Sequence, residues 1–211
     1  MARIHRFARH AALAVILCFL AASASARTLM VFGDSLSAAY NLSPEQGWVS
    51  LLGKRVSRLD ASWRVVNASV SGETTAGGLR RLSEDLKRHK PAIVVIELGA
   101  NDALRGQPVA GIRSNLEQMI RLARQARAEP VLVGIMIPPN YGIDYAAEFR
   151  ALYGDLAARH AVALVPFLLE GIADDPALFQ ADQLHPTAQA QPRIVDNVWP
   201  AVEPLLRKRA R

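Results

Sequence analysis

Short apolar runs alternate with longer amphipathic stretches along the chain after residue 26. The apolar runs are rich in β-branched residues, which is typical of buried strands. We expect five strands, at residues 29–32, 65–67, 93–98, 131–137 and 162–167. The amphipathic stretches predict helices near residues 45–59, 75–89, 108–128, 145–160 and 187–206. Strands that alternate with helices in this way predict a parallel sheet with right-handed crossovers.

The start of the first helix is the most clearly marked boundary. Ser43 is a good capping residue, Pro44 suits the first helical position, and Gln46 is placed to close a capping box. The loop from Ser35 to Leu42 is therefore expected to be short. It carries Ser35 from the end of the first strand, and ligands of open α/β sheets bind outside the carboxyl ends of the strands.

The first 26 residues have the pattern of a secretory signal. Three arginines precede the apolar stretch 11–22, and the small residues Ala24-Ser25-Ala26 follow it. This arrangement predicts an exported protein that is cleaved before Arg27. We therefore expect a periplasmic or secreted location.

A permanent membrane anchor is the alternative use of that segment. Its apolar stretch is about a dozen residues long, shorter than the roughly 20 that a spanning helix requires. Cys18, the one cysteine of the chain, follows Leu17, where a lipoprotein signal has a small residue. We expect no integral membrane segment and no lipid anchor after cleavage.

The charge of the chain is mostly explained by targeting. The whole chain carries a net charge of +6, and removal of the three signal arginines leaves +3 on residues 27–211. The basic tail 207–211 either touches anionic lipid or is a solvated terminus. We expect no nucleic-acid partner. Residues 27–211 are expected to form one domain, and because they show no heptad pattern a monomer is favoured.

Candidate chemistry begins with Gly33-Asp34-Ser35-Leu36, which follows the first predicted strand directly. A second cluster near the end of the chain contains Asp182, His185 and Pro186. Ser, His and Asp together activate a weak nucleophile, because an oriented imidazole takes the hydroxyl proton. The three-residue spacing lets a tight turn hold the Asp182 carboxylate beside the His185 imidazole. The alternative is a surface turn in which Asp182 merely caps.

Other polar residues follow the second and third predicted strands. Gly72 lies in the loop after the second strand, and Gly99, Asn101 and Asp102 follow the third. A glycine lets backbone N–H groups approach a ligand, and Asn supplies an amide donor. Gly72 also fits a simple turn, and the Asn-Asp pair also fits a loop or a helix cap. Their common position at strand ends indicates donors for an oxyanion.

The other two histidines of residues 27–211 are weaker candidates for a base. His89 lies in a polar stretch, and His160 ends a predicted helix, so both are expected to be solvated. A different chemical class has Asp34, Asp102, Asp182 and His185 hold a divalent metal for phosphoester hydrolysis. That alternative has no recognised metal spacing and leaves Ser35 without a task.

These ordered blocks resemble the SGNH hydrolases, also called GDSL lipases and esterases. The residues that carry the resemblance are Gly33-Asp34-Ser35-Leu36-Ser37, Gly72, Gly99-x-Asn101-Asp102 and Asp182-x-x-His185-Pro186. The resemblance covers essentially all of residues 27–211. Further blocks, Asn67 to Gly72, Glu97 to Gly106, Pro139 to Gly142 and Ala190 to Pro192, resemble the periplasmic subgroup with thioesterase, protease, lysophospholipase and arylesterase activities.

The resemblance implies a flavodoxin-like three-layer α/β/α sandwich with five parallel strands. It implies Ser35 as nucleophile, His185 as base and Asp182 as its orienting partner. The implied oxyanion hole comprises the backbone N–H groups of Ser35 and Gly72 and the side chain of Asn101. No cofactor and no metal are implied. Glu73 departs from the family pattern, because relatives usually have Asp after the glycine of this block.

The implied substrates are small acyl esters and thioesters, with membrane lysophospholipids among the reachable ones. The apolar segment that contains Ile137, Pro138, Pro139 and Tyr141 is either an acyl-contacting flap or a plain connection. An O-acetylesterase acting on cell-envelope sugars is the alternative function, because acetylated sugars present the same carbonyl. The Gly-x-Ser-x-Gly elbow of the larger α/β-hydrolases is missing around Ser35.

Overall fold

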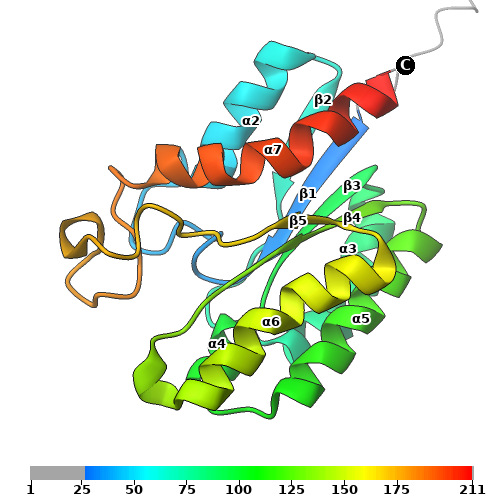
Figure 1. Ribbon diagram of the computed structural model, residues 1–211. Coiled ribbons are helices and arrows are strands. Elements are labelled where there is room, and N and C mark those ends of the chain that lie inside the picture. The colour runs from blue at the N-terminus through cyan, green and yellow to red at the C-terminus, as the bar shows by residue number, and fades with distance from the viewer. Residues whose placement is uncertain (1–26, 211) are drawn as a thin grey trace, which may run out of the picture.

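Five parallel strands form one sheet in the computed structural model, which describes residues 27–210 (Figure 1). The predicted export signal, residues 1–26, lies outside the described residues. The strands are β1 (Arg27–Gly33), β2 (Trp63–Asn67), β3 (Ile93–Glu97), β4 (Glu129–Val133) and β5 (Ala163–Val165). Their spatial order is β2-β1-β3-β4-β5, and every neighbouring pair is parallel. The predicted five-stranded parallel sheet is confirmed.

Helices cover both faces of this sheet. One face carries α2 (Trp48–Leu59) and α7 (Gln191–Ala210), which pack on each other (Figure 1). The other carries α3 (Thr75–His89), α5 (Val109–Gln125) and α6 (Ile143–His160). Short helices α4 (Ala100–Leu104), η1 (Pro139–Tyr141) and η2 (Pro176–Leu178) lie in the connections. The three-layer arrangement agrees with the expected fold.

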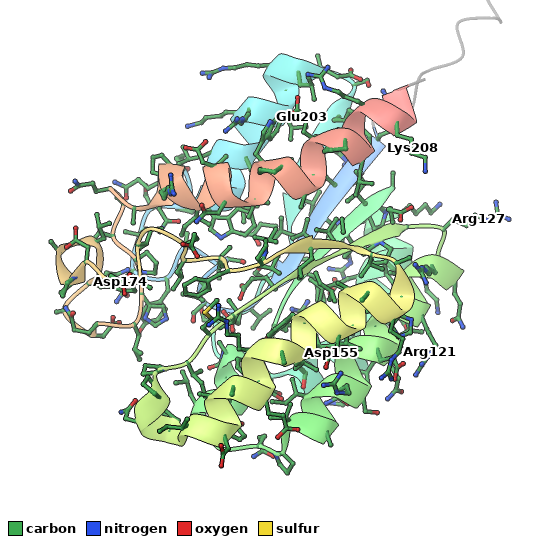
Figure 2. All side chains as sticks on the ribbon, in the orientation of Figure 1. Arg121, Arg127, Asp155, Asp174, Glu203 and Lys208 are labelled. Carbon is green, nitrogen blue, oxygen red and sulfur yellow. The ribbon has the colours of Figure 1, made fainter. Side chains whose placement is uncertain are left out.

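The core follows from this layering. Strands covered on both faces have no solvent side, so they read as continuous apolar runs rather than as alternating ones. Leu29–Phe32 of β1 and Ile93–Ile96 of β3 are fully buried. Charged side chains such as Arg121, Asp155 and Lys208 project from the outer sides of the helices (Figure 2).

The start of α2 corrects one prediction from the sequence. Gln46 Oε1 does accept a hydrogen bond from the backbone N–H of Ser43, at 3.1 Å, but this closes a separate turn. The helix begins at Trp48, whose backbone N–H donates to Gln191 Oε1 at 3.0 Å. The cap is therefore supplied by the first residue of α7, a long-range contact that no local capping pattern reveals.

Several other elements differ from the expected ones, and β5, for example, ends at Val165 rather than at residue 167. The last helix begins at Gln191 rather than at residue 187, and α4 was not expected. Pairing of β4 ends at Val133, although the apolar run continues to Ile137. Within residues 27–210, no helix is long and apolar enough to cross a membrane.

The strand order decides where the chemistry lies. A parallel sheet of order 2-1-3-4-5 reverses its winding between β1 and β3, and ligands bind at the carboxyl ends of the strands at such a switch point. The loops after β1, β2 and β3 emerge there together. They carry Ser35, Gly72 and Asn101.

Candidate active site

Ser35 lies on a tight turn that follows β1 directly. The backbone N–H groups of Ser37 and Ala38 both donate to the carbonyl oxygen of Asp34, at 3.2 and 2.9 Å. Asp34 Oδ1 also accepts from the backbone N–H of Leu36 at 3.0 Å, which is an Asx-turn. These bonds fix the backbone around Ser35 without a glycine elbow.

Ser35, His185 and Asp182 are hydrogen-bonded in series. Ser35 Oγ lies 2.8 Å from His185 Nε2, although 150 residues separate the two in the chain. His185 Nδ1 lies 2.8 Å from Asp182 Oδ2. With the Nδ1 proton directed to the carboxylate, Nε2 is free to accept the Ser35 proton.

Asp182 is held in its charged form by its own turn. Its Oδ1 accepts from the backbone N–H groups of His185 and Leu184, at 3.0 and 2.9 Å. These bonds, that of His185 above all, lower the pKa of Asp182 to about 2. Gln183 takes a left-handed conformation, with φ of 56°, in this turn. The carboxylate therefore stays ionised beside the imidazole at neutral pH.

Tyr40 and Gln180, which no motif in the sequence singles out, support His185. The ring of Tyr40 lies 4.3 Å from the imidazole, centroid to centroid. Gln180 donates from its backbone N–H to the carbonyl oxygen of His185 at 2.8 Å. Its side chain donates to the carbonyl oxygens of Tyr40 and Pro186, at 3.0 and 3.2 Å. Gln180 thus links the two segments that enclose the imidazole.

The candidate oxyanion donors come from three different loops. In the described part of the chain, no hydrogen bond occupies the backbone N–H of Ser35 or of Gly72. Gly72 has φ of +77°, and a Cβ there would meet nothing within 4 Å, so glycine is needed for the backbone angle rather than for space. Asn101 Nδ2 donates one hydrogen to Asp34 Oδ2 at 2.9 Å and has a second to give.

Asp102 does not turn toward these donors. Its carboxylate is 4% exposed and accepts from the backbone N–H and the hydroxyl of Thr75, at 2.8 and 2.6 Å. It therefore caps the N-terminus of the neighbouring helix α3. Asn101 therefore belongs to the candidate site, whereas Asp102 stabilises the start of α3.

Glu73, the residue after Gly72, is held in place by an ion pair. Glu73 Oε2 accepts from Arg81 Nε at 2.7 Å, and its side chain is 13% exposed. A Cβ at position 77 would overlap Glu73 Oε1, so Gly77 leaves room for the longer acid. Arg81 also stacks on the ring of Phe32, with Cζ 4.0 Å from the centroid. Glu73 thereby connects the loop of Gly72 to the strand that precedes Ser35.

A cavity of about 650 Å³ opens beside the candidate nucleophile. Ser35, Asn101 and His185 lie in its wall. Most of the remaining wall is apolar and comprises Leu36, Ala100, Leu104, Ile135, Met136, Ile137, Pro138, Phe167, Leu169, Ala173, Pro176, Phe179 and Leu184. Cavities of roughly 300–1,000 Å³ hold ligands the size of drug molecules. This cavity has room for an apolar chain next to Ser35.

The four segment residues proposed as acyl contacts are divided by the structure. Ile137 and Pro138 lie in the wall of the cavity. Pro139 and Tyr141 lie outside it in η1, where Tyr141 is 44% exposed. The apolar run thus reaches the cavity only before η1 begins.

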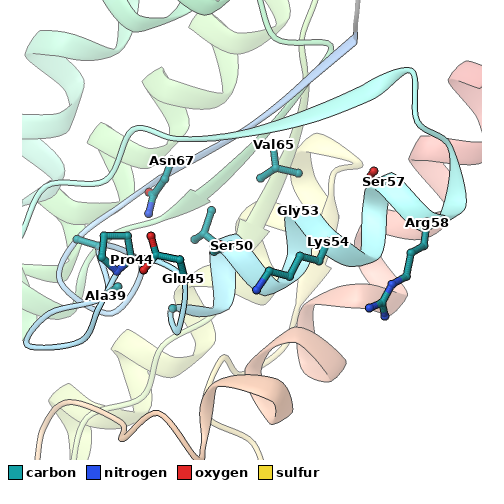
Figure 3. A pocket seen from close by; sticks show the side chains of 13 residues that line it. Ala39, Pro44, Glu45, Ser50, Gly53, Lys54, Ser57, Arg58, Val65 and Asn67 are labelled. Atoms are coloured by element: carbon teal, nitrogen blue, oxygen red, sulfur yellow. The ribbon is translucent and has the colours of Figure 1, made fainter.

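Another cavity, of about 710 Å³, lies between α2 and the edge strand β2 (Figure 3). Small side chains such as Ala39 and Ser50 line it, together with Lys54 and Arg58. None of the candidate catalytic side chains borders it, so it has no share in the arrangement around Ser35.

Metal binding was the competing interpretation of the acidic residues. Within residues 27–210, no three His, Cys, Asp or Glu side chains are grouped as a metal site requires. Asp102 and Asp182 are occupied by the bonds described above.

His160, expected to be solvated, instead pairs with Glu117 through Nε2 at 2.8 Å. That prediction was wrong, because helix α5 brings an acid to the end of α6.

Comparison with known proteins agrees with this architecture. Residues 31–192 match the GDSL-like Lipase/Acylhydrolase family. The chain is 51% identical over 190 residues to Esterase TesA of Pseudomonas aeruginosa, covering 90% of this chain and 94% of that protein. It is 41% identical over 192 residues to Thioesterase 1/protease 1/lysophospholipase L1 of Escherichia coli K12, covering 91% and 90%.

A solved structure of TesA superimposes with a TM-score of 0.82 at 51% identity, covering 85% of this chain and 99% of that one. The match extends over most of both chains and includes the loops that bring Ser35, Asn101 and His185 to one cavity. The protein therefore belongs to the GDSL-like lipase/acylhydrolase family, the SGNH hydrolases, and is an ester-bond hydrolase.

Proposed function

We propose that this protein is an exported serine esterase in which Ser35 is the nucleophile, His185 the general base and Asp182 its orienting partner. The observation that carries the proposal is the continuous hydrogen-bond chain from Asp182 through His185 to Ser35, with Ser35 at the wall of an apolar cavity. His185 takes the Ser35 proton as the oxygen attacks the acyl carbonyl.

The negative oxygen that forms is stabilised by three donors in this proposal. They are the backbone N–H groups of Ser35 and Gly72 and the amide of Asn101, which come from three loops at one edge of the sheet. Fixed donors aimed at a developing charge supply much of the rate enhancement in acyl transfer. His185 then protonates the leaving alcohol or thiol, and an acyl-Ser35 ester remains. Water, activated by His185 in the same way, then attacks the acyl-Ser35 ester and releases the carboxylic acid and free Ser35.

The substrates that fit are carboxylic esters and thioesters with an extended acyl chain. The apolar wall of the 650 Å³ cavity supports this class over acetyl groups, which would leave most of the cavity unfilled. The relatives are named as an esterase and as a thioesterase and lysophospholipase, which supports the same range. Lysophospholipids of the cell envelope are within reach of an exported enzyme. The alternative function is a sugar O-acetylesterase. The preferred acyl-chain length distinguishes it from an esterase for longer chains.

Export is proposed from residues 1–26, which have the pattern of a cleaved signal. The location is then periplasmic or secreted, with residues 27–211 as the mature domain. Amino-terminal sequencing of the protein recovered from the periplasm or medium tests this. A mature chain that begins at Arg27 is expected, whereas an uncleaved chain in the cytosol would refute it.

The decisive test of the function is hydrolysis of p-nitrophenyl esters from acetate to palmitate. Ser35→Ala serves as the matched variant, with a fluorophosphonate arm and an EDTA arm. We expect activity that depends on Ser35, is blocked by the fluorophosphonate and is unaffected by EDTA. The expected preference is for acyl chains longer than acetyl. Activity that survives Ser35→Ala, or that EDTA abolishes, would favour metal-dependent chemistry instead.

A further inference from the structure

Two carboxyl groups lie together beneath the turn of Ser35, and the proposed reaction gives neither of them a task. Asp34 precedes Ser35, and Glu97 is the last residue of β3. Both side chains are fully buried. The two strands are in register with Gly33 opposite Glu97, and the backbone N–H of Asp34 lies 3.4 Å from Glu97 Oε2. An acid at the end of an otherwise apolar central strand requires a physical reason.

Glu97 is packed directly against the backbone of β1. Its Oε2 accepts a hydrogen bond from Ser37 Oγ at 2.6 Å. A Cβ at Gly33 would lie 2.6 Å from the same oxygen, so only glycine leaves space for this carboxyl. Within residues 27–210, Glu97 Oε1 has no hydrogen-bond partner. An ionised carboxylate would be poorly satisfied in this place.

Asp34 has a different set of contacts. Its Oδ1 accepts from the backbone N–H of Leu36 at 3.0 Å, and its Oδ2 accepts from Asn101 Nδ2 at 2.9 Å. N–H donors aimed at both oxygens favour the charged form of a carboxyl. In the described part of the chain, neither Asp34 nor Glu97 forms an ion pair with a lysine or an arginine.

Two buried carboxyls without a cation cannot both be ionised, so the pair retains a proton. The donors on Asp34 and the unpartnered oxygen of Glu97 put that proton on Glu97. Burial, together with the nearby charge of Asp34, raises the pKa of Glu97 well above its usual range. Burial also raises the pKa of Asp34 to about 6, while the N–H groups of Leu36 and Asn101 act in the opposite direction.

We propose that Glu97 is a neutral carboxylic acid at neutral pH, and that it positions the oxyanion donor Asn101 through Asp34. Protonated Glu97 still pairs with Ser37, because a hydroxyl accepts as well as donates. Asp34 is then the charged member of the pair and holds one N–H of the Asn101 amide, so the other N–H is directed to the substrate. The role of Asn101 rests on the proposed function, whereas the protonation of Glu97 does not.

The first test is the pH dependence of stability. Above the usual pKa of a glutamate, the unfolded chain loses the Glu97 proton while the folded protein keeps it, so rising pH favours unfolding of the wild type. Glu97→Gln removes this effect and keeps the shape of the neutral acid. We expect the unfolding constant of the wild type, divided by that of Glu97→Gln, to rise by up to about tenfold per pH unit between about pH 5 and pH 8.

Other ionisable groups near the pair are present in both proteins, so their contributions cancel in this ratio to first order. Asp102 and Tyr153 lie near the pair, and His185 acts on Asp34 from outside. Burial raises the pKa of Tyr153 well above its usual value, which keeps it neutral throughout. Glu84→Gln, on the exposed side of α3, is the matched control and should give a constant ratio. A constant ratio for Glu97→Gln as well would overturn the neutral acid.

The second test is the effect on turnover of an acyl ester. Glu97→Ala should lower kcat, and Glu97→Gln should restore most of it, because the amide supplies the same neutral volume. Asp34→Asn should lower kcat by about 10²–10³ with little change in KM. A misdirected Asn101 amide no longer donates to the oxyanion, and that hydrogen bond matters mainly in the transition state. Unchanged kcat in a folded Asp34→Asn would overturn the positioning of Asn101.

These two tests separate the inference from the function on which it partly rests. Active Ser35→Ala would refute the proposed mechanism, yet the stability ratio would still report the proton on Glu97. Should Asp34→Asn fail to fold, Asn101→Asp supplies the positioning test, because it places a second acid against Asp34. The turnover of Asn101→Asp relative to that of the wild type should be low at neutral pH and should rise as the pH is lowered, because protonation of either acid restores a hydrogen-bond donor between positions 34 and 101, whereas wild-type-like turnover at all pH values would contradict the proposal.

Discussion

The ring of Tyr40 lies against the imidazole of His185, with centroids 4.3 Å apart and planes tilted by 33°. Tyr40 belongs to the turn that follows Ser35. Gln180 donates hydrogen bonds to the carbonyl oxygens of both Tyr40 and His185. His185, the proposed base, is thus held from one side by the loop that carries Ser35 and from the other by its own loop. Such packing fixes the ring plane, and the Asp182 bond fixes the tautomer.

Tyr40→Ala should lower kcat by about ten- to a hundredfold, because a loosened imidazole spends less time aligned with Ser35. Tyr40→Phe keeps the ring and should keep most of the activity. Steady-state kinetics of the two variants on one p-nitrophenyl ester makes the comparison. Equal loss in both variants would point to the hydroxyl group rather than to the ring contact.

The wall of the cavity predicts where acyl-chain selectivity is set. Ile137→Trp fills space beside Ser35 and should shift the preferred ester toward shorter chains. Tyr141→Ala changes a side chain outside the cavity and should leave that preference unchanged. The ratio of kcat/KM for butyrate and palmitate esters measures both effects. If only Tyr141→Ala changed this ratio, the acyl chain would contact η1 rather than the cavity wall at Ile137.

Glu73 and Gly77 should be energetically coupled, because Glu73 Oε1 occupies the space of a Cβ at position 77. In a Glu73→Ala background, Gly77→Ala should stabilise the protein by roughly 0.5–1 kcal/mol through helix propensity. In the wild type the same change displaces Glu73 from Arg81, so the gain should shrink or reverse. Urea unfolding of the four proteins completes the double-mutant cycle. Simple additivity would show that Glu73 relaxes without cost.

Asp182 makes a prediction for acid conditions. Its pKa is lowered to about 2 in the folded protein, so the stability that its carboxylate provides is present above the usual aspartate range and is lost as pH falls from about 4 to about 2. Asp182→Asn should therefore differ from the wild type in urea midpoint near pH 6, and less near pH 2. The variant should also lose up to about 10⁴ in kcat, because the tautomer is no longer fixed. If the difference in urea midpoint were the same at pH 6 and pH 2, the ionised Asp182 carboxylate would not stabilise the turn.

Much of the scaffold follows from local pattern alone. The apolar runs in β1 and β3 are buried on both faces, so hydrophobicity marks them clearly, and α3 spans the predicted residues 75–89. Pattern fails where a tertiary contact sets the boundary. Gln191 caps α2 from the far end of the chain, and no rule about residues 43–46 can anticipate that.

The candidate site divides in the same way. Ser35, Asp182 and His185 stand out in the sequence because their types and spacing have a chemical use. Tyr40 acts only through its position in space, so its residue type gave no signal. Glu97 did carry one, as a lone acid ending an apolar strand, but its meaning depends on the burial of both Glu97 and Asp34.

Covalent catalysis by Ser35 is tested best by mass spectrometry of the acid-quenched reaction with a slowly hydrolysed acyl ester. In the wild type, we expect one acyl group on the peptide that contains Ser35. Ser35→Ala should carry none and should not hydrolyse the ester. Full turnover without any acylated Ser35 peptide, or with Ser35→Ala as active as the wild type, would show that Ser35 is not the nucleophile.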